Sequence, residues 1–213
     1  MAAPACVSHD VSGHACIVLD IRKPGLCGAM QIVDGLSVVD LESGHRTQTD
    51  SDGNFSVPLP EHARSAVLQI AEGRPDRITS VVGVPDAPAD DVLVPVITTT
   101  LWTTYLTGIH VPPQDPSTAT IHVSFPFPGV YLGGAQIEGA AQVIYDQGDA
   151  FNWGPTPPGD QTIALMALGV PTDAGSVMLN AVLRTDQVIF NAPVPVQAGA
   201  ITWVYIDPAK PQL

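Results

Sequence analysis

The sequence predicts an all-β protein made of two tandem antiparallel β-sandwich modules, of the immunoglobulin-like or transthyretin-like kind. Three observations favour this class. Lys and Glu, which favour helices, occur only twice and four times, whereas 21 Pro and 19 Gly favour turns. Hydrophobic residues make up 45% of the 213 residues, which is enough to build a core. Short apolar segments recur about every ten residues, which is typical of a β-sandwich.

Residues 12–99 are expected to form the first sandwich. Its strand candidates are residues 16–21, 36–40, 46–50, 55–59, 66–71, 77–82 and 92–98. The segment Asp50-Ser51-Asp52-Gly53-Asn54 predicts a tight β-hairpin turn, because Gly53 tolerates a positive φ and the Asp50 carboxylate can cap the turn. Replacing Gly53 by Ala is therefore expected to cost roughly 1 kcal/mol or more.

Residues 100–117 are expected to bridge the two modules. The β-branched content of residues 100–109 favours a strand, but the spacing of Leu101, Tyr105, Leu106 and Ile109 favours a short helix, which we prefer. The three prolines of residues 111–117 are typical of an extended linker.

Residues 118–208 are expected to form the second sandwich. Its strand candidates are residues 118–125, 135–138, 141–146, 161–168, 176–182, 187–196 and 201–206. The last of these, residues 201–206, carries apolar side chains at both odd and even positions. We therefore expect this strand to be buried on both faces.

Residues 46–60, with the sequence RTQTDSDGNFSVPLP, resemble the signature of carboxypeptidase regulatory-like domains, which are small transthyretin-like (prealbumin-like) β-sandwiches. Residues 35–40 match the Gly-led strand upstream of that signature. Residues 132–139 and 146–149 resemble a second, degenerate copy. The resemblance implies tandem non-catalytic modules that serve as spacers, stabilisers or adhesive units in secreted proteins, often bacterial surface proteins and lipoproteins. Their partner would be a protein or a surface polysaccharide.

The net charge of −13 indicates which partners to exclude. Nucleic acids and anionic lipids both attract a basic surface, so this acidic chain is not expected to bind either. No apolar run reaches the ~18 residues that a membrane-spanning helix needs.

The N-terminal residues 1–10 lack the basic region and the apolar stretch of a signal peptide. Ala3-Pro4-Ala5-Cys6 nevertheless looks like the end of a small-residue cleavage site followed by a cysteine. Cys6 is therefore a candidate lipid anchor, and the alternative is a plain disordered terminus. We expect the protein to be extracellular, or to lie in the periplasm or cell envelope of a bacterium.

The three cysteines leave several interpretations open. Cys6, His9, His14 and Cys16 lie close together in the sequence and are a chemically valid zinc set, although their spacing matches no common zinc module. In an oxidising compartment Cys16 and Cys27 can instead form a disulfide, with Cys6 left over. Three free thiols are the third possibility.

A calcium site has to be weighed against the turn at Gly53. Asp50, Asp52, Asn54 and Glu61 occupy positions 1, 3, 5 and 12 of a loop like that of an EF-hand. Phe55, however, stands where such a loop requires Gly. The turn is therefore the favoured interpretation, and Asp50 and Asp52 remain weak candidate ligands.

The sequence contains no motif for catalysis or for holding a cofactor. It has no Gly-x-Ser-x-Gly elbow, no His-Glu-x-x-His pair and no Gly-rich phosphate loop. Enzymes that share the transthyretin-like fold need a C-terminal Tyr-Arg-Gly-Ser or a paired Tyr/His iron set, and neither is present. We expect a protein that is not an enzyme and has no cofactor.

Phe151 and Trp153 are the candidate ligand-binding residues, in a loop-like, Pro-rich stretch beside short polar side chains. One interpretation is an aromatic ring that stacks on a sugar. The other, which we favour, is that Trp153 folds back as a lid over the end of the sandwich. The sequence thus predicts a non-enzymatic secreted or envelope structural or interaction module. The alternative is a carbohydrate-binding module that uses an exposed loop Trp.

Overall fold

Strands dominate the computed structural model, which describes residues 9–26, 33–125, 132–158, 162–183, 185 and 187–206. The strands are β1 (Asp10–Ile17), β2 (Ser37–Asp40), β3 (Arg46–Gln48), β4 (Asn54–Pro58), β5 (Ala66–Ile70), β6 (Arg77–Ile78), β7 (Ser80–Val84), β8 (Ala89–Thr98), β9 (Ala119–Ser124), β10 (Leu132–Ile137), β11 (Gln142–Asp149), β12 (Asn152–Gly154), β13 (Ala164–Val170), β14 (Ser176–Leu183), β15 (Val188–Pro195) and β16 (Ile201–Tyr205), and the helix is α1 (Thr99–Gly108). The all-β class is confirmed. Within these residues no helix has the length and apolar character needed to cross a membrane.

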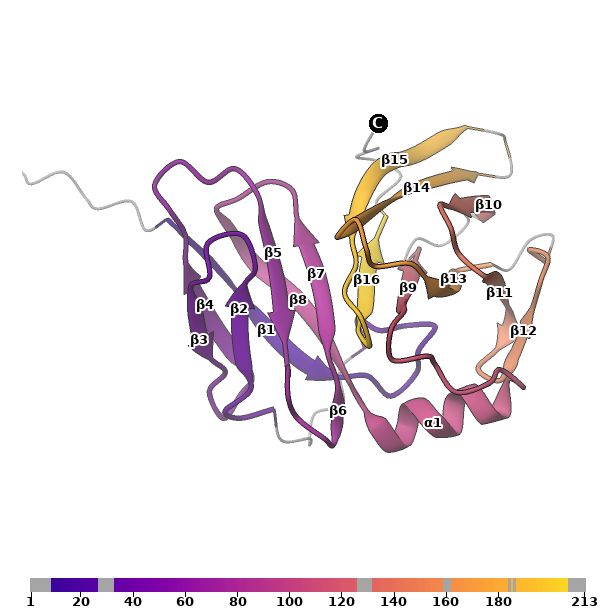
Figure 1. Ribbon diagram of the computed structural model, residues 1–213, viewed down its shortest axis with the longest axis horizontal. Coiled ribbons are helices and arrows are strands. Elements are labelled where there is room, and N and C mark those ends of the chain that lie inside the picture. Colours follow the sequence, from indigo (N-terminus) through magenta and orange to yellow (C-terminus); the bar gives the residue numbers. More distant parts are fainter. Residues whose placement is uncertain are drawn as a thin grey trace, which may run out of the picture.

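The strands of the described residues form three sheets (Figure 1). Four strands pair in the order β4-β1-β8-β6, and three in the order β10-β14-β15. The largest sheet has nine strands in the order β12-β11-β13-β9-β16-β7-β5-β2-β3. Its first-half strands pack against the four-stranded sheet, and its second-half strands pack against the three-stranded sheet.

The last strand, β16, joins the two halves of the chain. It runs parallel to β7 of the first half, with Ile201 opposite Ser80, and parallel to β9 of the second half, with Ile201 opposite Thr120. β1 and β8 also pair in parallel, so the expectation of purely antiparallel sheets is wrong. Because one sheet runs through both halves, the division into two tandem modules at residues 100–117 stays a prediction.

Strands β13, β9 and β16 of the nine-stranded sheet are covered on both faces. In β13, Leu165 and Ala167 point into the core shared with the three-stranded sheet, whereas Met166 and Leu168 point to the opposite face. β9 is buried along its whole length, and in β16 the residues from Ile201 to Val204 are buried. The expectation that residues 201–206 form a strand buried on both faces is confirmed for this stretch, because a period of two sends alternate side chains to opposite cores.

The expected hairpin at residues 46–60 is wrong, although its turn chemistry is right. Gly53 has a φ of +85°, and the Asp50 carboxylate accepts hydrogen bonds from the N–H groups of Asp52 (2.9 Å) and Asn54 (2.8 Å). The flanking strands do not pair, since β3 pairs with β2 and β4 pairs with β1. The turn is an arch between two sheets. The Ala15 N–H donates to the Gly53 carbonyl (2.8 Å) and so directs β4 onto β1.

Candidate functional site

Helix α1 confirms the short helix expected at residues 100–109, and it is the element around which the candidate site is built. The Thr98 hydroxyl accepts the Leu101 N–H (3.1 Å) and caps the first turn. Trp102, Tyr105 and Leu106, at i, i+3 and i+4, are buried against the core. The opposite face is exposed and consists of threonines, namely Thr100, Thr103, Thr104 and Thr107.

An aromatic cluster connects α1 to the turn between β11 and β12. The Tyr105 ring stacks with Trp102 at 6.4 Å between centroids, and it contacts Phe151 at 5.7 Å and the edge of Trp153 at 6.1 Å. Phe151 lies directly over Gly108, where a Cβ would overlap its ring. The helix end and the β11–β12 turn therefore hold each other in place.

A shallow groove lies along the exposed face of α1. It is lined by Thr99, Thr100, Thr103, Thr104, Thr107, Gly108 and Phe151. The Phe151 side chain is 51% exposed, so part of its ring is open to solvent at one end of the row of hydroxyls. A ring face beside several hydroxyls can contact a sugar by stacking and hydrogen bonding.

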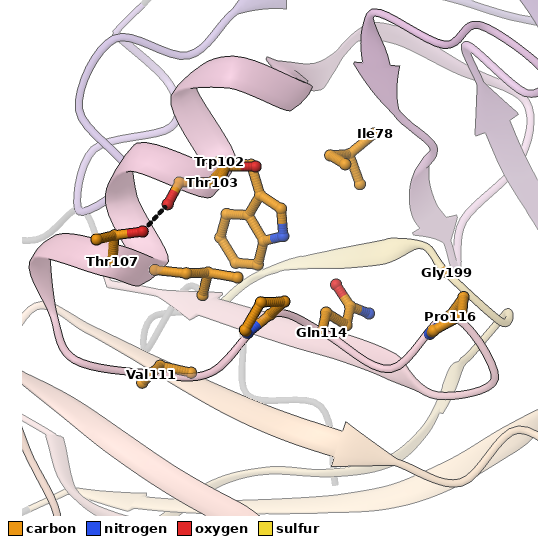
Figure 2. A pocket seen from close by; sticks show the side chains of 10 residues that line it. Ile78, Trp102, Thr103, Thr107, Val111, Gln114, Pro116 and Gly199 are labelled. Atoms are coloured by element: carbon orange, nitrogen blue, oxygen red, sulfur yellow. Dashed lines mark hydrogen bonds between the residues drawn. The ribbon is translucent and has the colours of Figure 1, made fainter.

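A second pocket, of about 270 Å³, lies beside α1 and shares Thr103 and Thr107 with the groove (Figure 2). Its walls come from α1, from β6, from the loop that leads to β9 and from the loop between β15 and β16. The lining residues are Ile78, Trp102, Thr103, Leu106, Thr107, Val111, Pro113, Gln114, Pro116 and Gly199. No side chain in this set is ionisable. The pocket therefore suits a neutral ligand better than a charged one.

Charged groups gather behind the aromatic cluster. Arg22 forms an ion pair with Asp20 (2.8 Å) and donates a hydrogen bond to the Gly148 carbonyl (2.9 Å) in the second half. Burial disfavours ionisation of Asp20, but hydrogen bonds and charge from Arg22 outweigh it and hold the pKa of Asp20 below its usual value. Burial raises the pKa of Asp146 and also that of Tyr105. The cluster links the loop after β1 to the end of β11.

The structure places the two predicted ligand-binding residues differently. Phe151 is exposed, whereas Trp153 is partly buried against the core and donates its indole N–H to the Ala150 carbonyl (3.1 Å). Trp153 thus lies where the lid interpretation expects it. Sequence reasoning missed Trp102 and the threonine face. The helical spacing of Tyr105 and Leu106 could have revealed the threonine face and the burial of Trp102, but not the pocket beside Trp102.

Among the residues that the structure describes, the predicted metal ligands do not come together. Within the described ranges, no group of three or more His, Cys, Asp or Glu side chains is arranged to hold a metal. The Asp50 carboxylate is occupied by backbone N–H groups of its own turn. Cys16 is disulfide-bonded and therefore has no thiolate to offer zinc. Cys6 and Cys27 lie outside the described residues, so the pairing of Cys16 with Cys27 stays a prediction.

Comparison with known proteins gives little guidance. No protein-family model matches the chain, and no curated protein matches its sequence. A solved structure that is similar to the chain comes from work titled "Alpha-glucan recognition by family 41 carbohydrate-binding modules from streptococcal virulence factors", with 9% identity and a TM-score of 0.25. The match covers 96% of this chain and 100% of that chain, and a TM-score this low supports no conclusion about fold or function.

Proposed function

We propose that this chain is a non-enzymatic structural or interaction module of a secreted or envelope-attached bacterial protein. The sequence of residues 46–60, which resembles carboxypeptidase regulatory-like domains, supports this assignment through its turn at Gly53, although β3 and β4 join different sheets. The observation that carries it is the nine-stranded sheet, in which β16 pairs with β7 and with β9. A spacer or stabiliser needs stiffness, and a continuous hydrogen-bonded sheet gives more of it than two modules on a flexible linker.

Stiffness across both halves predicts cooperative unfolding. We expect one transition in urea, in which the far-UV circular dichroism signal and the tryptophan fluorescence change together. Trp102 reports on α1, Trp153 on β12 and Trp203 on β16, whereas the circular dichroism signal reports on all strands. Two separate transitions would contradict a single stiff unit and would instead indicate two independent tandem modules.

The disulfide at Cys16 supports a location outside the cytoplasm, because disulfides persist in oxidising compartments. The chain has three cysteines and a disulfide occupies two, which leaves one thiol. In protein that carries no lipid on Cys6, we expect one reactive thiol per denatured chain without reductant, and three with it. If Cys16 pairs with Cys27, Cys6→Ser leaves no reactive thiol and Cys27→Ser exposes two. Three reactive thiols in protein isolated from the envelope would contradict this location.

Carbohydrate binding is the second candidate function, and the observation that favours it is the half-exposed Phe151 ring beside the threonine face of α1. The Trp153 indole is less suited, because it is partly buried and packs on Tyr105 in a T-shaped arrangement. The carbohydrate-binding alternative predicted from the sequence used Trp153, and the structure favours Phe151 in its place. The stacking residue would be Phe151, and Trp153 would support it from below.

Gel electrophoresis through immobilised polysaccharides tests this candidate. If a polysaccharide retards the protein, Phe151→Ala should weaken the retardation about tenfold, because the ring supplies the stacking surface. Met178→Ala is the matched control, since Met178 is another exposed apolar residue (43%) and lies on β14. Equal retardation of wild type and Phe151→Ala would reject Phe151 as the contact.

Trp153→Ala should lower the free energy of unfolding by about 2 kcal/mol, because it removes the ring that covers this end of the core.

A further inference from the structure

We propose that the pocket beside Trp102 is a binding site for a small neutral molecule, with an apolar body and one hydroxyl or carboxamide group. This proposal does not depend on the structural role or on the sugar surface proposed above. It rests on the pocket of about 270 Å³ and on the polar groups of two residues that line it, Trp102 and Gln114. A liquid water occupies about 30 Å³, so the pocket has room for roughly nine atoms of that size.

The first polar group is the indole N–H of Trp102. The side chain is only 3% exposed, and in the described part of the chain no protein atom accepts a hydrogen bond from Nε1. Figure 2 shows Nε1 on the side of the ring that faces Ile78 and Gln114 across the pocket. Buried donors without an acceptor are rare, because each costs free energy. A ligand oxygen would supply the acceptor.

The other two indoles provide the contrast. Trp153 donates its N–H to the Ala150 carbonyl, and Trp203 donates to the Ser80 hydroxyl, both at 3.1 Å. Among the tryptophans, Trp102 alone lacks an acceptor within the described residues. The unsatisfied donor is thus specific to the residue that lines the pocket.

The second polar group is the Gln114 side chain. Its Nε2 donates to the carbonyl oxygens of Thr118 (3.2 Å) and Ala200 (3.5 Å), which fixes the orientation of the amide. The amide oxygen is therefore the end that is left to accept, and Figure 2 shows it directed into the space between Ile78 and Trp102. One donor and one acceptor at the same pocket match a ligand group that both accepts and donates.

The remaining walls define the body of the ligand. Leu106, Val111, Pro113 and Pro116 offer apolar surface, and the Thr107 hydroxyl already donates to the Thr103 carbonyl (2.8 Å). Because no charged side chain lines the pocket, an ionised ligand would lose hydration without gaining a counter-charge. Saturated rings and branched chains with a single polar group fit this lining.

Cyclohexanecarboxamide is a suitable probe, and cyclohexanecarboxylate is its charged counterpart. In ¹H–¹⁵N spectra we expect the amide to shift the Trp102 indole signal saturably, while the Trp153 and Trp203 signals stay in place. The carboxylate should bind at least about tenfold more weakly, because its charge is not compensated. Trp102→Phe identifies the signal, and calorimetry of that variant should show about three- to tenfold weaker binding of the amide.

Val111→Phe fills the pocket without removing either polar group, and it should abolish the shift of the Trp102 signal. Val188→Phe is its control, since Val188 is 37% exposed on β15, away from the pocket. The proposal is overturned if the amide causes no saturable shift up to its solubility limit. It is also overturned if amide and carboxylate shift the signal equally, or if the shift persists in Val111→Phe.

Discussion

Gly53→Ala is expected to destabilise the protein by about 3 kcal/mol or more, well beyond the cost of its backbone conformation alone. Two effects add at this position. The φ of +85° is unfavourable for any residue with a Cβ. A Cβ would also overlap the Ala15 carbonyl oxygen and come within 2.7 Å of Val33 Cγ2. The turn between β3 and β4 lies so close to β1 that one of them has to move.

Gly44→Ala separates these two effects. Gly44 has a similar φ of +75°, but a Cβ there would have no other atom within 4 Å. We expect Gly44→Ala to cost only about 1–2 kcal/mol, the conformational part. Urea unfolding of both variants measures the difference, provided that their m-values equal that of the wild type. Equal losses in the two variants would show that the close approach at Gly53 does not contribute.

The turn at Gly53 could be predicted from the sequence, but the strand that β4 pairs with could not. Gly53 and the Asp50 carboxylate follow local rules, so the turn was predictable. Which strand β4 joins depends on the contact between the Gly53 carbonyl and Ala15, about forty residues away, and no local pattern encodes that contact. The strand periodicity predicts buried faces well, as in residues 201–206. It does not say that β16 inserts between β7 and β9.

The candidate site shows the same limit. The sequence indicates Phe151 and Trp153 as candidate binding residues, because they are aromatic and lie in a Pro-rich stretch. It does not predict how exposed each ring is, because both rings pack on Tyr105, which lies about fifty residues earlier on α1. Trp102 carried no signal as a binding residue, because an apolar side chain on a helix is usually core. Only the arrangement of Gln114 and the loop after α1 places a pocket beside its N–H.

His122 makes the folded state sensitive to acid. This residue of β9 is fully buried, and its ring lies 5.0 Å from Trp203 and 6.5 Å from Trp153 between centroids. Neither ring nitrogen makes a hydrogen bond of ordinary geometry within the described residues, and the backbone of Ile21 only partly offsets the effect of burial on the pKa. Burial lowers the pKa of His122 from 6.5 to about 3. The folded protein therefore holds His122 neutral at pH values where the unfolded chain binds a proton.

The stability that depends on a neutral His122 is present above the unfolded pKa of 6.5 and is lost as the pH falls towards 3. From pH 7 to pH 5 the loss attributable to this residue is expected to be about 2 kcal/mol, and at pH 3 about 4 kcal/mol. His122→Met places an uncharged side chain of adaptable shape in the same space. We expect this variant to match or exceed the wild type at pH 7, because it leaves no buried nitrogen unpaired.

The measurement is the difference in unfolding free energy between wild type and His122→Met at pH 7 and at pH 5. The difference matters because nearby carboxyls also titrate. Because the pKa of Asp146 is raised in the folded state, Asp146 stabilises the fold at low pH, and this stabilisation is lost as the pH rises. The pKa of Asp20 is lowered, so Asp20 stabilises the fold at higher pH, and this stabilisation is lost as the pH falls. Both carboxyls are present in both proteins, so subtraction removes most of their effect. His62→Gln, at an exposed histidine, is the control and should keep the pH dependence of the wild type. If His122→Met loses as much stability as the wild type between pH 7 and pH 5, the buried imidazole is not the acid-sensitive group.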